Sequence, residues 1–203
     1  MSARVRLTAI GFGTAFLLAL TVWLFVGAPG TARSSSVDST GWAGAIRPSI
    51  PAQPLDGLKD QDGRPAKLAS DVTIVTFLYT SCEDTCPTTA QQIRGALDRL
   101  GSDAPPTIAI SVDPSGDTAK SANAFLADQG LKGRMDYLLG PPVALQRQWT
   151  IYGIQPQLKD SEHSASVVLL DRTGKQRIGF PVDKLTPEAL AADVEKLRAE
   201  PSA

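Results

Sequence analysis

The sequence is poor in residues that bind soft metals or serve as imidazole bases. Its 203 residues include only two cysteines and one histidine. Two cysteines are too few for the disulfide framework that stabilises small secreted proteins. Lysine plus arginine (20) and aspartate plus glutamate (21) nearly cancel, leaving a formal net charge of −1. No basic stripe interrupts this balance, so the composition argues against a nucleic-acid-binding protein.

Charged side chains are also missing from the segment 7–32, whose centre is almost entirely apolar. A bilayer-spanning helix needs about 20 residues, whereas the apolar core of a secretory signal is shorter. Arg4 and Arg6 precede the segment, and the positive-inside rule then predicts that the chain after Arg33 is exported. We expect residues 1–32 to form a single-pass anchor in the inner (cytoplasmic) membrane, with a cleaved signal as the alternative.

The exported part divides into a tether and one domain. Residues 33–54 are rich in glycine, serine, alanine and proline and show little periodicity, which is typical of a flexible tether. Residues 55–203 suffice for one ordinary domain with its own core. Hairpins are predicted at the turn Asp62-Gly63 and around 171–174.

Strands and helices alternate through most of this domain. Apolar, β-branched runs predict strands at 73–79, 107–112, 135–139, 165–171 and 176–180. Helices are expected from Pro87 to Leu100, after Thr118, over 142–152 and after Thr186. This order predicts an α/β fold: a mixed sheet flanked by helices, thioredoxin-like in outline.

The two cysteines and the histidine each adjoin a predicted buried strand. Cys82 and Cys86 follow the first strand, and His163 comes just before the strand at 165–171. Cys86 is nearer the start of a helix, whose dipole is expected to lower the pKa of its thiol. Glu83 and Asp84 oppose thiolate formation at Cys82. These observations leave open a redox disulfide between Cys82 and Cys86, a metal site, or both.

A metal site made from these residues favours copper. Two thiolates and one imidazole suit Cu(I) and can also accept Cu(II). Other candidate ligands have simpler interpretations: Met135 as a core residue, and Asp113 and Asp117 as turn and helix-cap residues.

Several blocks, taken in order, resemble the Sco/SenC family of copper-binding cytochrome c oxidase assembly proteins. The resemblance covers roughly residues 55–197. The blocks are the opening turn at 58–64, Phe-Leu-Tyr-Thr-Ser-Cys-Glu-Asp-Thr-Cys-Pro at 77–87, Ser-Val-Asp-Pro-Ser-Gly-Asp-Thr at 111–118, and 163–165 followed by 168–174. One position departs from the family pattern, because Glu83 stands where a proline commonly follows the first cysteine.

The resemblance implies a thioredoxin-like copper-binding domain on a membrane anchor, facing the periplasm or its mitochondrial equivalent. It implies copper bound by Cys82, Cys86 and His163. It further implies a chaperone, not a turnover enzyme, that helps to mature the copper A centre of cytochrome c oxidase subunit II. Such a protein delivers copper, or reduces the target's cysteines so that another copper carrier can load them.

Two other classes of protein fit parts of the pattern. A thiol–disulfide oxidoreductase acting on exported proteins would use the Cys82–Cys86 pair, although the usual motif has two intervening residues and this one has three. A peroxidase would need one cysteine of low pKa and would leave the second cysteine and His163 without a role.

Overall fold

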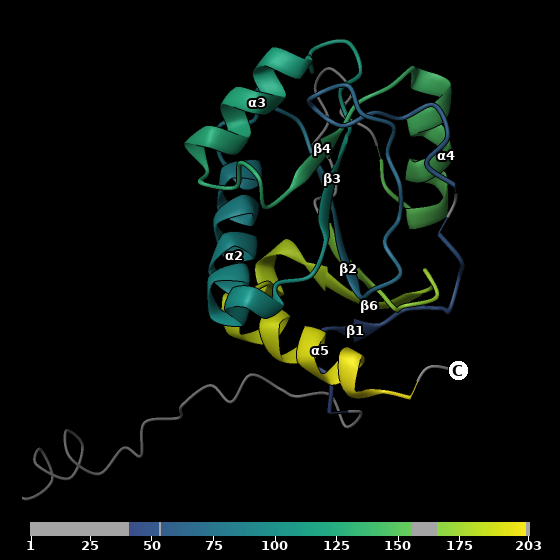
Figure 1. The fold of residues 1–203 in the computed structure, drawn as a ribbon, viewed down its shortest axis with the longest axis vertical. Coiled ribbons are helices and arrows are strands. Elements are labelled where there is room, and N and C mark those ends of the chain that lie inside the picture. The colour runs from purple at the N-terminus through teal and green to yellow at the C-terminus, as the bar shows by residue number, and fades with distance from the viewer. Residues whose placement is uncertain (1–40, 53, 156–165, 202–203) are drawn as a thin grey trace, which may run out of the picture. The chain divides into compact units, whose positions relative to one another are not determined.

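The computed structural model describes residues 41–52, 54–155 and 166–201. Figure 1 shows helices packed around a central sheet. The strands are β1 (Ala45–Ile46), β2 (Thr73–Leu78), β3 (Thr107–Ser111), β4 (Asp136–Leu138), β5 (Ser166–Leu170) and β6 (Gln176–Pro181). The α-helices are α2 (Thr85–Leu100), α3 (Ala119–Asp128), α4 (Pro142–Tyr152) and α5 (Pro187–Ala199), and two short 3₁₀ helices cover Gly101–Asp103 and Val182–Lys184.

The six strands form one mixed sheet in the order β1-β6-β5-β2-β3-β4. Strands β2, β3 and β4 run parallel, whereas β5 and β6 are antiparallel to their neighbours. The parallel part follows the alternating strands and helices of the sequence, and the antiparallel part follows the turn at 171–174. This is the thioredoxin-like mixed sheet flanked by helices that the sequence predicts.

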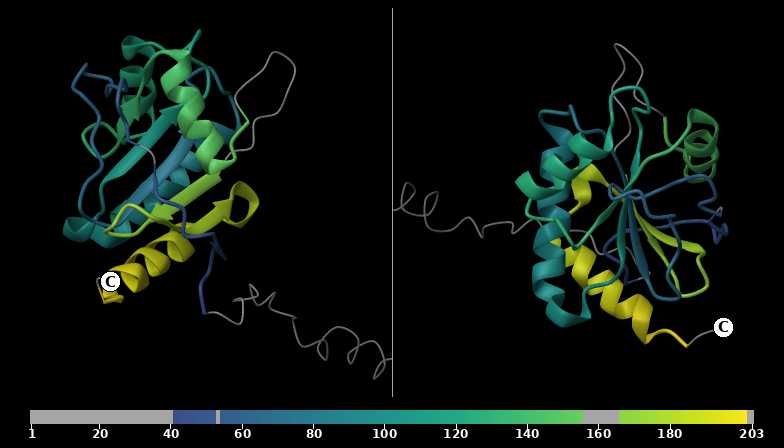
Figure 2. Two further views of the ribbon diagram at one scale, coloured as in Figure 1. Left: turned by 90° about the vertical axis from the view of Figure 1, so that its right-hand side faces the viewer. Right: turned by 45° about the horizontal axis from the view of Figure 1, so that its top comes forward.

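Helices cover both faces of the sheet. Figure 2 shows α2, α3 and α5 on one side and α4 on the other. Strand β2 is buried along its whole length, and its alternate side chains enter two cores. Ile74 and Leu78 pack with the α2, α3 and α5 side, and Val75 and Phe77 pack with the α4 side. Burial on both faces explains why apolar residues in the 73–79 run point to both faces and do not alternate with exposed polar ones.

Local signals fix the helix ends. Pro87 lies in the first turn of α2, and Pro142 and Pro187 begin α4 and α5, where a missing N–H costs little. Helix α2 ends at Gly101, which takes a φ of 56°. The predicted starts of α4 and α5 and the predicted end of α2 are confirmed, whereas α2 begins at Thr85, two residues before the predicted start.

The predicted hairpin at 55–64 is only partly confirmed. Its turn forms, with the Gly63 N–H donating to the Asp60 carbonyl at 3.0 Å. Its flanks make a single bridge, Lys59 to Pro65, and no regular strand. Lys59 instead exchanges two backbone hydrogen bonds with Leu139, of 2.8 and 2.9 Å. The segment thus covers the open edge beside β4, which protects the sheet from edge-to-edge pairing.

The structured domain begins earlier than the sequence indicates. Residues 41–52 fall within the predicted tether, yet β1 pairs with β6 and Trp42 is only 7% exposed. The Asp193 carboxylate of α5 accepts the N–H of Ala43 at 3.0 Å and of Gly44 at 2.8 Å, one on each oxygen. We call residues 42–44 with Asp193 the N-terminal clamp. The tether prediction is therefore wrong for these residues, because small residues that lack periodicity can still be held by a buried partner.

The predicted anchor at 1–32 and most of the tether lie outside the described residues. None of the helices in 41–52, 54–155 and 166–201 is long and apolar enough to cross a membrane. The anchor remains a prediction.

Candidate functional site

The cysteines lie where the parallel strands β2 and β3 end together. Leu78 pairs with Ser111, the last residue of β3, and the Leu78 carbonyl accepts the Val112 N–H at 3.0 Å. The chain after β2 carries the cysteines, and the chain after β3 forms the turn at 112–118. The carboxyl ends of parallel strands are the usual position for binding sites in open α/β sheets.

The two thiols are brought together by the start of α2. Cys82 lies in the loop and is partly exposed, whereas Cys86 lies in the first turn of the helix and is 0% exposed. The Cys86 N–H donates to the Cys82 Sγ at 3.2 Å. The two side chains are also hydrogen-bonded to each other. A spacing of three intervening residues thus still brings both sulfurs to one point.

The two thiols have opposite acidities. Burial acts to raise the pKa of Cys82, but hydrogen bonds outweigh it and hold that pKa below its ordinary value. They come from the Cys86 side chain, the backbone N–H groups of Cys86 and Asp84, and the Tyr79 hydroxyl. Burial raises the pKa of Cys86 far above its ordinary value, and the nearby Cys82 and Asp117 act in the same direction.

This reverses the expectation from the sequence. Proximity to the helix start suggested that Cys86 would have the lower pKa. In the structure the N–H groups of Asp84 and Cys86, at the start of α2, donate to the sulfur of Cys82, and Cys86 itself is buried in the core. The more nucleophilic thiol is therefore Cys82.

Tyr79 is a site residue that the sequence analysis missed. Its hydrogen bond to Cys82, together with burial, raises the pKa of Tyr79 to about 12. The residue follows β2 directly, and its side chain packs partly against both cores. Its position three residues before Cys82 was a usable signal, because a short loop that turns back brings such residues into contact.

Of the acidic residues after β3, Asp113 has the predicted role and Asp117 does not. Asp113 Oδ1 accepts from the backbone N–H groups of Ser115 and Gly116, as a turn residue does. Thr118 is the N-cap of α3, with a capping box to Ser121. Asp117 instead turns toward the cysteine loop and accepts two hydrogen bonds from Thr80. Met135 is buried in the core, as predicted.

His163 lies outside the described residues, so the site geometry comprises the two cysteines and their surroundings. Across the described parts of the chain, no group of three or more histidine, cysteine, aspartate or glutamate side chains is arranged to hold a metal ion. The cysteine pair supplies two soft sulfur donors, the ligand type that selects Cu(I).

Comparison with known proteins settles the family. The SCO1/SenC family model matches residues 57–199. The chain belongs to the SCO1/SenC family. This confirms the resemblance to that family, and the matched range contains Cys82, Cys86 and His163. Among curated protein sequences, none matches this chain.

Solved structures of SCO1/SenC proteins share the fold. ScoI of Bradyrhizobium japonicum, with copper bound, is 31% identical, with a TM-score of 0.61 over 74% of this chain and 99% of that one. Yeast Sco1 with copper bound is 20% identical, with a TM-score of 0.64 over 77% of this chain and 92% of that one. BsSco, a cytochrome c oxidase assembly protein in which a disulfide switch has been identified, is 21% identical, with a TM-score of 0.66 over 77% and 99%.

Proposed function

We propose that this SCO1/SenC protein is a copper chaperone that binds the metal through Cys82, Cys86 and His163. The observation that carries the proposal is the hydrogen-bonded pair of thiols at the start of α2, in a chain 31% identical to a ScoI solved with copper. Two adjacent sulfurs suit a soft monovalent cation. A bound cation would also favour the thiolate of Cys86, which burial otherwise disfavours.

The short stretch of chain between His163 and β5 supports His163 as the third ligand. Ser166, the first residue of β5, follows His163 by three positions, and its carbonyl accepts the Thr76 hydroxyl at 3.3 Å. Val167 pairs with Thr76 in the antiparallel register, so the chain enters β5 beside the carboxyl end of β2. Three residues span at most about 11 Å. This short connection to the neighbour of β2 supports His163 as the third ligand.

In this proposal copper is the cargo. An anchor at 1–32 holds the domain on the extracytoplasmic side of the inner membrane, and the copper A centre of cytochrome c oxidase subunit II receives the metal. Because Cys82 is partly exposed and Cys86 is buried, a partner's thiolate can most easily bind the copper ion from the Cys82 side and replace that ligand.

A copper(I) titration of the full chain, with detergent present and under reducing conditions, tests the ligand set. We expect one copper per chain, binding lost in Cys82→Ser and Cys86→Ser, and affinity sharply lower in His163→Ala. Glu162→Gln, a neighbouring change that removes no candidate ligand, serves as the matched control. Binding that ignores His163 would refute the three-ligand form.

A second function, thiol–disulfide exchange on exported copper proteins, is supported by the unequal thiols. A partly exposed cysteine of lowered pKa beside a buried partner suits attack by one thiol and resolution by the other. Exchange with a disulfide-bonded model peptide is expected to need both cysteines and to persist in His163→Ala. Exchange activity without any copper binding would make this the main role.

A further inference from the structure

The carboxylate of Asp117 is the centre of a polar cluster next to the cysteine loop. Its Oδ1 accepts the backbone N–H and the hydroxyl of Thr80, both at 2.8 Å. Its Oδ2 accepts the Ser111 hydroxyl at 2.6 Å and the Tyr137 hydroxyl at 2.9 Å. One side chain thus takes four hydrogen bonds, and charge-assisted bonds of this kind are stronger than neutral ones.

The donors on Oδ2 belong to the rigid part of the domain. Ser111 ends β3, and its carbonyl accepts the Trp149 indole N–H of α4 at 3.0 Å. Tyr137 lies in β4 and is completely buried, with its ring against Phe125 of α3. The position of the carboxylate is therefore fixed by two strands and, through them, by helices on both faces of the sheet.

The donor on Oδ1 belongs to the loop that must be positioned. Thr80 follows β2 and precedes Cys82 by two residues. Between backbone groups the loop forms a long hydrogen bond of 3.3 Å, from the Cys82 N–H to the Tyr79 carbonyl, and the N–H groups of Asp84 and Cys86 donate to the Cys82 sulfur. Within the described chain, Asp84 at the N-cap of α2 makes no side-chain capping bond. Through its two bonds from Thr80, Asp117 thus attaches the start of the loop to the ends of β3 and β4.

We propose that Asp117 is a positioning residue for the dithiol. By fixing Thr80 to the ends of β3 and β4, it holds the Cys82 sulfur beside Cys86 and so raises the effective concentration of one thiol for the other. The inference deepens the proposed function, on which its importance for copper depends. Its consequence for the cysteine pair itself does not require copper.

The readout is the redox equilibrium of the full chain with glutathione. One oxidised glutathione is reduced to two glutathione thiols as the Cys82 and Cys86 thiols lose two protons and two electrons and form one S–S bond. The equilibrium constant gives the effective concentration of the pair. A general loss of stability does not alter this quantity as long as the chain remains folded, which circular dichroism checks.

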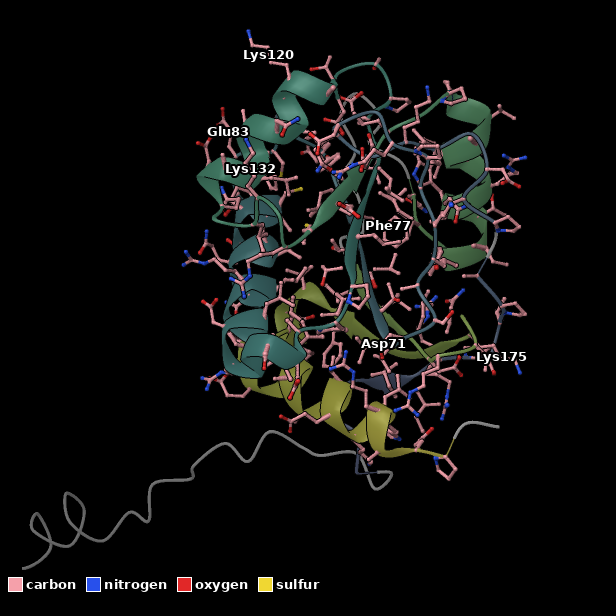
Figure 3. The ribbon with its side chains drawn as sticks, viewed as in Figure 1. Asp71, Phe77, Glu83, Lys120, Lys132 and Lys175 are labelled. Carbon is pink, nitrogen blue, oxygen red and sulfur yellow. The ribbon has the colours of Figure 1, made fainter. Side chains whose placement is uncertain are left out.

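Three variants test whether Asp117 affects the dithiol through its hydrogen bonds, through its charge or through the general stability of the domain. Asp117→Ala removes all four bonds. Asp117→Asn keeps an oxygen for Thr80, and its amide can donate to the oxygens of the Ser111 and Tyr137 hydroxyls, which have acceptor lone pairs. Asp171→Ala is the matched control, because Asp171 also accepts two backbone N–H groups and a hydroxyl, in the β5–β6 hairpin. Figure 3 shows Lys175 of that hairpin at the end of the molecule away from Glu83, the neighbour of Cys82.

We expect Asp117→Ala to lower the effective concentration at least about tenfold, the equivalent of one lost charge-assisted hydrogen bond. Asp117→Asn should stay within about threefold of the parent, because the geometry survives. Asp171→Ala should leave the value unchanged. Two results would overturn the proposal: a loss in Asp117→Ala no larger than in Asp171→Ala, or an equal loss in Asp117→Asn, which would make charge the cause. Because no copper is added, a failed copper titration leaves this test intact.

Discussion

Two carboxylates hold chain segments in this domain, and their donors differ in kind. Asp193 in the N-terminal clamp accepts two backbone N–H groups, one on each oxygen. Asp117 at the cysteine edge accepts one backbone N–H and three hydroxyls. Backbone N–H groups only donate, whereas hydroxyls can rotate and accept. The clamp therefore requires both oxygens of a carboxylate, whereas at the cysteine edge an amide NH₂ can replace one oxygen by donating to the hydroxyl oxygens.

The two regions also lie apart. Figure 1 shows α5 and β1 at the bottom of the view and α3 at the top. Asp193 is in α5, and Asp117 comes two residues before α3 begins. The clamp joins the residues at 42–44 to α5, so we expect it to affect stability, whereas the Asp117 cluster borders the cysteine loop. We therefore expect variants of Asp193 to change the stability of the domain, and variants of Asp117 to change the properties of the two thiols.

The largest effect on stability is expected from Asp193→Asn. The new amide NH₂ faces a backbone N–H in a buried site (Asp193 is 2% exposed), so one donor loses its acceptor. We expect a loss of about 2 kcal/mol in the free energy of unfolding, measured with urea. Glu195→Gln, an exposed change on the same helix, should cost less than about 0.5 kcal/mol. Altered cysteine reactivity in the folded Asp193→Asn variant would contradict the separation of the two regions.

The sequence alone does not predict that these two carboxylates hold chain segments. The order of strands and helices, the end of α2 and the proximity of the two cysteines followed from apolar periodicity, proline and glycine, because those are local properties. The role of Asp193 was not predicted and Asp117 was assigned to a turn or cap, because their partners, Gly44 and Tyr137, reach them only when the sheet has formed. The sequence around a short polar side chain does not show which distant group that side chain will bind.

The relative acidity of the two thiols could not be predicted from their distance to the helix start either. Distance from the helix start along the chain favoured Cys86 as the more acidic thiol. Burial reversed this, because Cys86 faces the core and the helix N–H groups serve Cys82. Which side of a helix turn faces the core could be inferred from Ile93 and Leu97, which lie on the same face of α2 as Cys86.

Alkylation should distinguish the two cysteines in the reduced protein. The thiolate is the reactive form. The lowered pKa of Cys82 makes it react below the pH at which ordinary thiols do, and its rate should fall as the pH falls through that pKa. The raised pKa of Cys86 keeps it protonated over the same range. We expect iodoacetamide to modify Cys82 at least about tenfold faster, since each unit of pKa separation changes the thiolate ratio tenfold.

Mass spectrometry of the modified peptide identifies which cysteine reacted. Cys82→Ser provides the control, because Cys86 alone should then react slowly until denaturant is added. Equal rates at the two positions in the folded protein would show that burial does not protect Cys86.

The smallest effect is expected from Glu83→Gln, at the position that departs from the family pattern. Glu83 is exposed, and the hydrogen bonds that lower the pKa of Cys82 come from Cys86, Asp84 and Tyr79. An exposed charge is screened by water and salt, so the alkylation rate of Cys82 should change by less than about twofold. Tyr79→Phe is the positive control, because it removes a hydroxyl bonded to the thiol and should slow the reaction several-fold more. A larger change in Glu83→Gln than in Tyr79→Phe would mean that loop charge, and not the contacts fixed by the fold, sets the acidity of Cys82.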